Sequence, residues 1–165
     1  TPHNKTLLHQ TLHALDEEPI DSSEVPDDAK RVSLCDITPL KARTGYGKAT
    51  RDRVPDASVL LCAGGTIHPR GFYAHAPAEY QWTLDGSWKS FEVGAAVADG
   101  HDGSVGFSIT GDGKPLWQSK KLKEGTVQPV KISIEGVKDL RLLTNDGGDG
   151  NRTDWGLWIN PVLAR

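Results

Sequence analysis

The sequence contains no methionine, only two cysteines and no surplus of positive charge. Its 19 Lys and Arg residues against 22 Asp and Glu residues give a formal net charge of -3, so no positive field is available to hold a nucleic acid. No apolar run reaches the length of about 18 residues that a membrane span needs, so no membrane partner is expected. Cys35 and Cys62 lack the CxxC or Cys/His spacing of a zinc site, which disfavours zinc.

Both cysteines lie in apolar segments with high β propensity, VSLCDI for Cys35 and SVLLCAGG for Cys62. They could be two buried thiols on neighbouring strands or the two halves of a disulfide. The sequence leaves both possibilities open, because it does not reveal the redox compartment.

Turn-forming residues are abundant, with 18 Gly and 10 Pro, and 5 Trp residues add large planar side chains. This composition favours a β-sandwich over a helical bundle. The length of 165 residues suits one domain with a real core. Because the chain begins with Thr1, we expect a mature form or a piece of a larger multidomain protein.

The first 31 residues differ in texture from the rest. Leucines at helical spacing predict a short amphipathic helix over residues 4–15, which also carries His9 and His13 on one face. A solvated face explains these histidines more simply than a transition-metal site does. Residues 17–30 are acidic and contain two prolines, which is typical of a linker. We therefore divide the chain into a helix and linker over 1–31 and a main domain over 32–165.

From residue 31 onward, short runs of β-branched and aromatic residues alternate with turn residues. Strands are predicted over residues 32–36, 58–62, 67–73, 78–84, 90–98, 104–110, 114–120, 127–133, 138–144 and 157–163. In EYQWTL, Tyr80, Trp82 and Leu84 should face the core while Glu79, Gln81 and Thr83 face water. The turns 85–87 and 111–114 are expected to close hairpins. Without crossover helices the sheets must be antiparallel, so the predicted fold is an all-β jelly-roll sandwich.

Motifs of catalysis are absent from the sequence. It has no GxSxG nucleophile elbow, no P-loop, no GxGxxG and no HExxH. Paired carboxylates of a glycosidase depend on spatial separation, and a sandwich of this size rarely encloses the cleft that they need. Binding is favoured over catalysis.

The stretch NDGGDGN, residues 145–151, concentrates carboxylates, carboxamides and glycines just before a Trp-rich tail. It could be a plain surface turn, an oxygen-rich calcium cage or a polar loop that faces a sugar. It does not fit an EF-hand, because Leu157 stands where a bidentate Glu is needed. A second acidic turn over residues 99–103 competes for a metal, or simply connects two strands.

His75 lies between alanines and ahead of Pro77, in GFYAHAPAE. Such a histidine is usually satisfied in the core. Here the small neighbours leave room beside the ring, and Pro77 marks a strand end where a ligand could approach. We therefore predict that His75 donates a hydrogen bond to a sugar hydroxyl.

Four segments together resemble the NPCBM group, carbohydrate-binding module family 51, whose members are attached to glycoside hydrolases such as those of family 98. They are CDITPLKARTGYGKATRD, RGFYAHAPAE, VADGHDGSVGFSITGDGKPLWQS and LRLLTNDGGDGNRTDWGLWINPVL, in order over residues 32–163. The resemblance implies a galactose-binding-like sandwich that recognises galactose-type glycans without catalysis. It also implies a possible structural Ca²⁺, for which Asp149, Asp99 and Asp102 are the candidate ligands.

Three positions depart from the family pattern: Ala78 replaces Ser, Trp155 replaces His and Leu157 replaces Asp. Since the pattern has Trp at 158, we assign Trp158 to the core or the floor of the site and Trp155 to an exposed platform for the apolar face of a pyranose. Tyr46, between two glycines, is a second platform. Asn145, Asp146 and Asp154 are the predicted polar contacts.

The predicted function is thus non-catalytic binding of a galactose-type or N-acetylgalactosamine-type glycan by part of a secreted, periplasmic or cell-surface protein. Two alternatives stay open. One is an adhesion or assembly module with an inactive sugar site, motivated by the changes at 78, 155 and 157. The other is a small glycoside-active enzyme that uses two of the carboxylates of Asp99, Asp102, Asp146 and Asp154.

Overall fold

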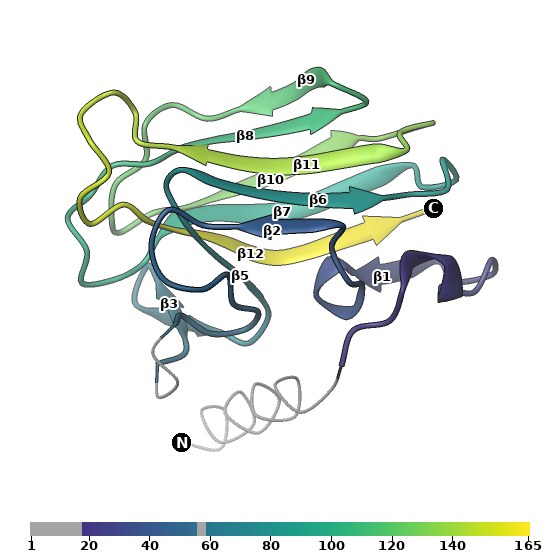
Figure 1. Cartoon of the computed structure of the whole chain (residues 1–165), viewed down its shortest axis with the longest axis horizontal. Helices are drawn as coiled ribbons and strands as arrows, with labels where there is room; N and C mark the ends of the chain where they lie inside the picture. The colour runs from purple at the N-terminus through teal and green to yellow at the C-terminus, as the bar shows by residue number, and fades with distance from the viewer. Residues whose placement is uncertain (1–17, 56–58) are drawn as a thin grey trace.

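Two antiparallel five-stranded sheets form the body of the protein in a computed structural model that describes residues 18–55 and 59–165 (Figure 1). The first sheet has the order β1-β12-β7-β10, with β5 also paired to β12. Its strands are β1 (Arg31–Ser33), β5 (Gly71–His75), β7 (Ser90–Val97), β10 (Val127–Ser133) and β12 (Trp155–Ala164). The second sheet has the order β2-β6-β11-β8-β9. Its strands are β2 (Lys41–Arg43), β6 (Ala78–Thr83), β8 (Gly106–Gly111), β9 (Lys114–Gln118) and β11 (Asp139–Asn145).

A small hairpin of β3 (Leu61–Ala63) and β4 (Thr66–His68) completes the strands of the described residues. The other described elements are two single turns of 3-10 helix, Ser22–Glu24 and Leu34–Asp36. The predicted all-β sandwich is confirmed. The helix predicted over residues 4–15 lies outside the described residues. Within the described residues, no helix is long and apolar enough to cross a membrane.

The main core lies between the two sheets, and alternation along the strands fills it. Tyr80, Trp82 and Leu84 are buried there, as predicted. Trp158 is fully buried in the same cluster, while Leu157 and Ile159 belong to a second cluster on the other face of the first sheet, where Leu61 and Ala63 of β3 pack. The two faces of β12 thus divide as period-two alternation requires.

Glu79 was predicted to face water. That prediction was wrong, because its side chain is only 11% exposed. The cause is β2, a strand that the sequence did not predict. It pairs with β6 and places Lys41 Nζ 2.7 Å from Glu79 Oε2, while Arg141 Nη1 donates to Oε1 at 3.0 Å. The hydrogen bond from Lys41 lowers the pKa of Glu79, with a further contribution from Arg141.

Two turn predictions had different outcomes. The turn at 111–114 closes the β8–β9 hairpin, with Asp112 and Gly113 both in the left-handed region at φ 50° and 78°, as a type I′ turn requires. The turn at 85–87 does not close a hairpin. It joins β6 of the second sheet to β7 of the first, because the two flanking strands pair with different partners.

Two other predicted strands also differ in their organisation. The strand predicted over 67–73 is divided into β4 and β5, which pair with different strands on either side of Pro69 and Arg70. The strand predicted over 32–36 ends at Ser33, whose hydroxyl accepts a hydrogen bond from the Cys35 amide and begins a 3-10 turn. Cys35 and Cys62 are both free thiols.

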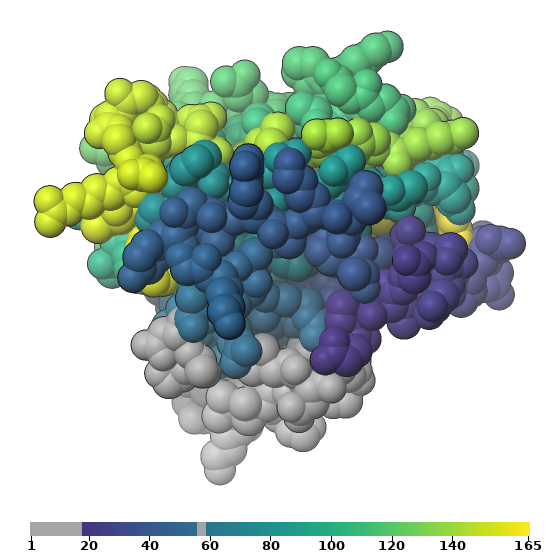
Figure 2. All heavy atoms as spheres, viewed as in Figure 1, coloured from purple at the N-terminus to yellow at the C-terminus, as the bar shows by residue number. Residues whose placement is uncertain are grey.

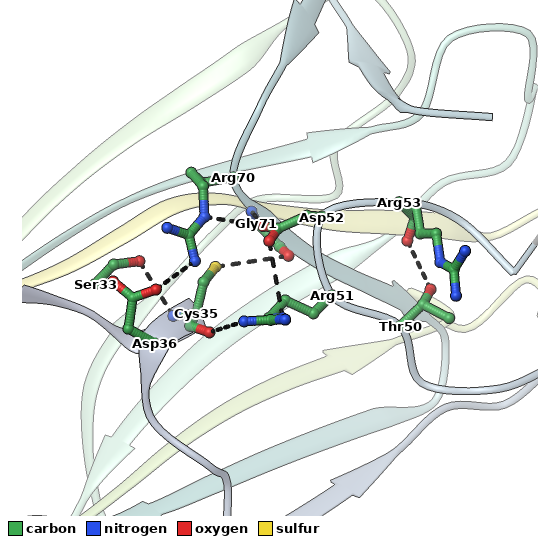
Figure 3. A network of polar contacts seen from close by, with 9 residues as sticks. All are labelled: Ser33, Cys35, Asp36, Thr50, Arg51, Asp52, Arg53, Arg70 and Gly71. Carbon is green, nitrogen blue, oxygen red and sulfur yellow. Dashed lines mark hydrogen bonds and ion pairs between the residues drawn. The ribbon is translucent and has the colours of Figure 1, made fainter. Parts of the chain in front are cut away.

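A polar network ties the start of β5 to two loops (Figure 3). We call it the Asp52 network; its residues are Ser33, Cys35, Asp36, Thr50, Arg51, Asp52, Arg53, Arg70 and Gly71. Asp52 is fully buried and accepts hydrogen bonds from the Gly71 amide at 3.0 Å and from Arg70 Nε at 3.3 Å. Arg70 also binds Asp36 at 2.7 Å.

Candidate functional site

Loops from both sheets meet at the end of the sandwich where β5 stops and β12 begins. There a cavity of about 480 Å³ lies between the loop after β2 and the loop before β12. We call it the ring cavity; it is lined by Gly45, Tyr46, His75, Asn151, Arg152, Thr153 and Trp155. Figure 2 shows the loop that precedes β12, in yellow-green, protruding beside the blue segment that contains Tyr46.

Three aromatic side chains form one wall of the ring cavity. Trp155 and His75 are directly paired across β12 and β5, and their ring centroids lie 6.2 Å apart. Tyr46 reaches them from its loop, with centroid distances of 5.7 Å to His75 and 6.2 Å to Trp155. The Tyr46 side chain is 62% exposed, whereas His75 is only 5% exposed. Such a wall suits the apolar face of a pyranose ring.

The Gly-Tyr-Gly turn is held against the histidine backbone. The Gly45 amide donates to the His75 carbonyl at 2.9 Å. A Cβ atom at Gly45 would lie 2.4 Å from the Ala76 carbonyl oxygen, so only glycine allows this approach. The backbone beside Tyr46 is therefore held close to the end of β5.

The indole of Trp155 is half-buried, whereas the sequence predicted an exposed platform. One of its faces is covered by His101, which stacks at 4.1 Å between centroids and 15° between planes. Tyr73 contacts it edge-on at 5.1 Å. Burial lowers the pKa of His101, which favours its neutral ring against the indole. Tyr46 is therefore the exposed ring of the cavity.

The hydrogen bonding of His75 shows which of its two ring nitrogens is already used within the protein. His75 Nδ1 lies 2.9 Å from the Ala76 carbonyl oxygen, which can only accept, so Nδ1 carries the proton. In the neutral ring Nε2 is then an acceptor. Nε2 is then the ring nitrogen left for a ligand, and the hydrogen bond to a sugar hydroxyl stays a prediction.

A second cavity, of about 540 Å³, adjoins the first. We call it the polar cavity; it is lined by Asp102, Gly103, Ser104, Lys123, Asp149, Gly150, Arg152, Thr153 and Asp154. Asp154 is 1% exposed and accepts from the Ser104 amide through Oδ1 at 3.0 Å, while its buried Oδ2 has no hydrogen-bond partner in the described structure. Burial, with the charge of Asp149 nearby, raises the pKa of Asp154.

The predicted site residues are only partly brought together. Tyr46, His75 and Trp155 share the ring cavity, and Asp154 lines the polar cavity beside it. Asn145 and Asp146 line neither. Their side-chain oxygens accept from the amides of Gly147 and Gly148, each at 2.9 Å, so they shape the loop as Asx turns.

The three candidate calcium ligands do not share one site. Asp99 accepts from the amides of Gly64 and Gly65, away from the polar cavity. Asp149 binds Lys121 Nζ at 2.9 Å and the Ser104 hydroxyl at 2.7 Å, while Asp102 accepts from the Thr153 hydroxyl. Residues 18–55 and 59–165 contain no group of three or more His, Cys, Asp or Glu side chains arranged to hold a metal. The three carboxylates therefore do not form one shared site, and calcium remains a prediction.

Sequence reasoning missed three residues of the site: His101, Arg152 and Thr153. His101 lies in the acidic turn 99–103, where only the carboxylates were considered as functional groups. Arg152 and Thr153 directly follow the glycine-rich stretch 145–151 and precede Asp154 and Trp155. Proximity to those residues was the available signal.

An antiparallel sandwich with a ring-lined cavity among its end loops defines a module of the galactose-binding-like class. The chain belongs to the NPCBM/NEW2 domain family, which matches residues 30–164. The solved CBM51 from Clostridium perfringens GH95, in complex with methyl-galactose, is 26% identical with a TM-score of 0.74, and the match covers 81% of this chain and 99% of that one.

Two further relatives are larger proteins. A protein of Renibacterium salmoninarum with the provisional name endo-alpha-N-acetylgalactosaminidase is 28% identical over 124 residues, which cover 70% of this chain and 8% of that protein. The structure of the M60 catalytic domain with CBM51-1 and CBM51-2 from Clostridium perfringens ZmpB is 26% identical, with a TM-score of 0.71, over 81% of this chain and 15% of that one. The chain thus spans a small part of these two proteins.

Proposed function

We propose that this domain is a non-catalytic carbohydrate-binding module that holds a galactose-type glycan in the ring cavity. The observation that carries the proposal is the wall of Tyr46, His75 and Trp155 beside the polar groups of residues 151–153. A pyranose needs an apolar surface for its C–H face and a few fixed donors and acceptors for its hydroxyls. The complex of the related CBM51 with methyl-galactose supports the same ligand class.

The carboxylates around the loops support binding rather than hydrolysis. Asp154 holds the Ser104 amide, Asp149 binds Lys121, and Asp146 accepts from its own loop. Each thus accepts a hydrogen bond within the protein, whereas a glycosidase needs one acid and one base facing the scissile bond. Turnover of a chromogenic galactoside that disappears in Asp154→Asn would instead establish the enzyme alternative.

The domain then anchors a larger polypeptide to a glycan outside the cell or on its surface. The larger relatives, of which this chain matches a small part, support this arrangement. A shallow cavity buries few ligand atoms, so a single site should bind with a dissociation constant of roughly 10 µM to 1 mM. Neighbouring modules on one chain would raise the avidity.

The test is a glycan array on the isolated domain, followed by calorimetric titration of Tyr46→Ala. Tyr46 is 62% exposed, so its removal should leave the fold intact while weakening binding by about tenfold or more. Leu40→Ala is the matched control, because Leu40 is 67% exposed and does not line the ring cavity.

A folded wild-type domain that binds no galactoside, fucoside or N-acetylhexosamine on the array would contradict this function. That result would favour the adhesion or assembly alternative with an inactive sugar site.

Calcium is a separate prediction with a test of its own. A cation that binds only the folded domain raises its melting temperature, so EDTA should lower that temperature. An unchanged melting temperature would contradict the predicted calcium ion. Glycan binding that persists in EDTA would show that the sugar site works without the metal.

A further inference from the structure

The ring cavity and the polar cavity are adjacent and share Arg152 and Thr153. These two residues therefore form a ridge with a cavity on each side. The Thr153 hydroxyl lies 2.8 Å from Asp102 Oδ1, which fixes the ridge to the loop between β7 and β8. A ligand that fills one cavity and extends past the ridge enters the other.

The linings of the two cavities differ in chemistry. The ring cavity has three aromatic rings, whereas the polar cavity has none and is lined by carboxylates, cationic groups and hydroxyls. One sugar residue can stack on rings, while a second can be held by hydrogen bonds alone. Because a sugar hydroxyl both donates and accepts, it suits a surface that offers donors and acceptors together.

The base of the polar cavity is formed by buried and hydrogen-bonded residues. Asp154 is buried beneath it with Oδ2 unpartnered, and the Ser104 side chain is held by Asp149. A Cβ atom at Gly103 would lie 2.3 Å from the Thr153 carbonyl oxygen and 2.4 Å from Asp154 Oδ1, so only glycine lets the two loops meet there. A buried carboxylate oxygen without a donor favours a ligand that supplies one.

The exposed cationic groups at this cavity are available to a ligand. Lys123 and Arg152 have no side-chain hydrogen bond or ion pair among the described residues. They can donate to hydroxyl oxygens, while the carboxylates of Asp102, Asp149 and Asp154 can accept. Because Asp149 is already paired with Lys121, Asp102 and Asp154 stand beside Lys123 and Arg152, and this lining carries no excess of positive charge to favour an acidic sugar.

We propose that the ligand is a neutral oligosaccharide of at least two residues, with one residue in the ring cavity and the next in the polar cavity across the Arg152–Thr153 ridge. This proposal rests on the proposed sugar-binding function and adds the length of the ligand and the charge of its second residue. Lys123, which lines the polar cavity alone, is then a specificity residue for the second sugar.

The experiment compares methyl-galactoside with a panel of neutral galactose-terminated disaccharides that differ in linkage, titrated into wild type and variants by calorimetry. At least one disaccharide should bind wild type about tenfold tighter than methyl-galactoside, because it fills both cavities. Lys123→Ala should weaken that disaccharide by about threefold to fivefold and leave methyl-galactoside unchanged. Lys120→Ala is the matched control, since Lys120 is exposed on the same segment and lines neither cavity.

The outcomes separate this inference from the function on which it rests. If every disaccharide binds no tighter than methyl-galactoside, or Lys123→Ala equals wild type on both ligand types, the second sugar position is overturned while the ring cavity stands. If an acidic disaccharide of the same linkage binds tighter than its neutral counterpart, the neutral assignment is overturned. If methyl-galactoside binds wild type and Tyr46→Ala equally, or neither, the proposed function fails and this inference fails with it.

Discussion

Asp52 and Asp154 are both almost fully buried, but their surroundings differ in kind. Asp52 lies among cationic groups: Arg70 Nε is 3.3 Å from Oδ1 and Arg51 Nε is 3.8 Å from Oδ2 (Figure 3). Oδ2 of both residues lacks a hydrogen-bond partner in the described structure, but Asp154 accepts only from the Ser104 amide, has no ion pair among the described residues, and lines the polar cavity. A buried carboxylate without a compensating charge lowers the stability of the fold. Such a carboxylate is expected at a binding site, where a ligand supplies the missing partner.

This contrast separates scaffold from site. In the Asp52 network, Arg51 and Arg70 bind carboxylates or a backbone carbonyl and so join the 3-10 turn Leu34–Asp36, the segment 50–53 and β5. At the loop end, Lys123 and Arg152 remain without a protein partner in the described residues. The first arrangement stabilises the fold, and the second leaves binding capacity at the surface.

The largest effect on stability is expected from Asp52→Asn. Asparagine keeps the shape and tolerates the left-handed φ of 63° at this position, but it removes the buried charge that Arg70 and Gly71 share. Urea denaturation should show a loss of about 2 to 3 kcal/mol in the free energy of unfolding, with glycan affinity of the folded protein unchanged. Asp36→Asn is the control: its side chain is 44% exposed, so its loss should stay below about 1 kcal/mol. Equal losses in the two variants would show that burial of the pair does not matter here.

A smaller effect is expected from Glu79→Gln, which tests a paired acid on the face of the second sheet. Because Lys41 and Arg141 lower the pKa of Glu79, its stabilisation is present above the ordinary pKa of 4.5 and is lost as the pH falls through the lower folded value. At pH 7 the variant should be about 1 kcal/mol less stable. The difference from wild type should vanish in acid. A difference that is independent of pH would point to packing instead of charge.

The smallest effect on stability, with a pH dependence opposite to that of Glu79→Gln, is expected from Asp154→Asn. Because the folded pKa of Asp154 is raised, its contribution to stability is fully present below the ordinary value of 3.8 and is lost as the pH rises through the folded value. The free energy of unfolding of wild type minus that of the variant should therefore fall as the pH is raised from 4 toward 7. Thermal melts across this range measure it. A difference that rises with pH would mean that Asp154 is paired in solution, and the contrast with Asp52 would be lost.

The alternation of apolar and polar residues correctly predicted the strands that have one apolar face. Tyr80 and Trp82 alternate with polar neighbours, and the same period places Trp158 in the core and Trp155 on the other face of β12. The β2 strand was missed because Lys41–Arg43 is short, polar and exposed at a sheet edge, where no apolar alternation is required. The turn at 85–87 was misassigned because a turn motif does not specify whether the next strand stays in the same sheet.

The sequence alone determined the sandwich class, the family resemblance and the aromatic residues of the site, because alternation, turn residues and side-chain chemistry are local properties of the chain. Only the tertiary structure decided that Tyr46 meets His75 and Trp155, that His101 covers the indole, and that residues 151–153 complete the cavity while Asn145 and Asp146 do not. These contacts join segments far apart in the chain, and their distances follow from how two sheets and their loops pack.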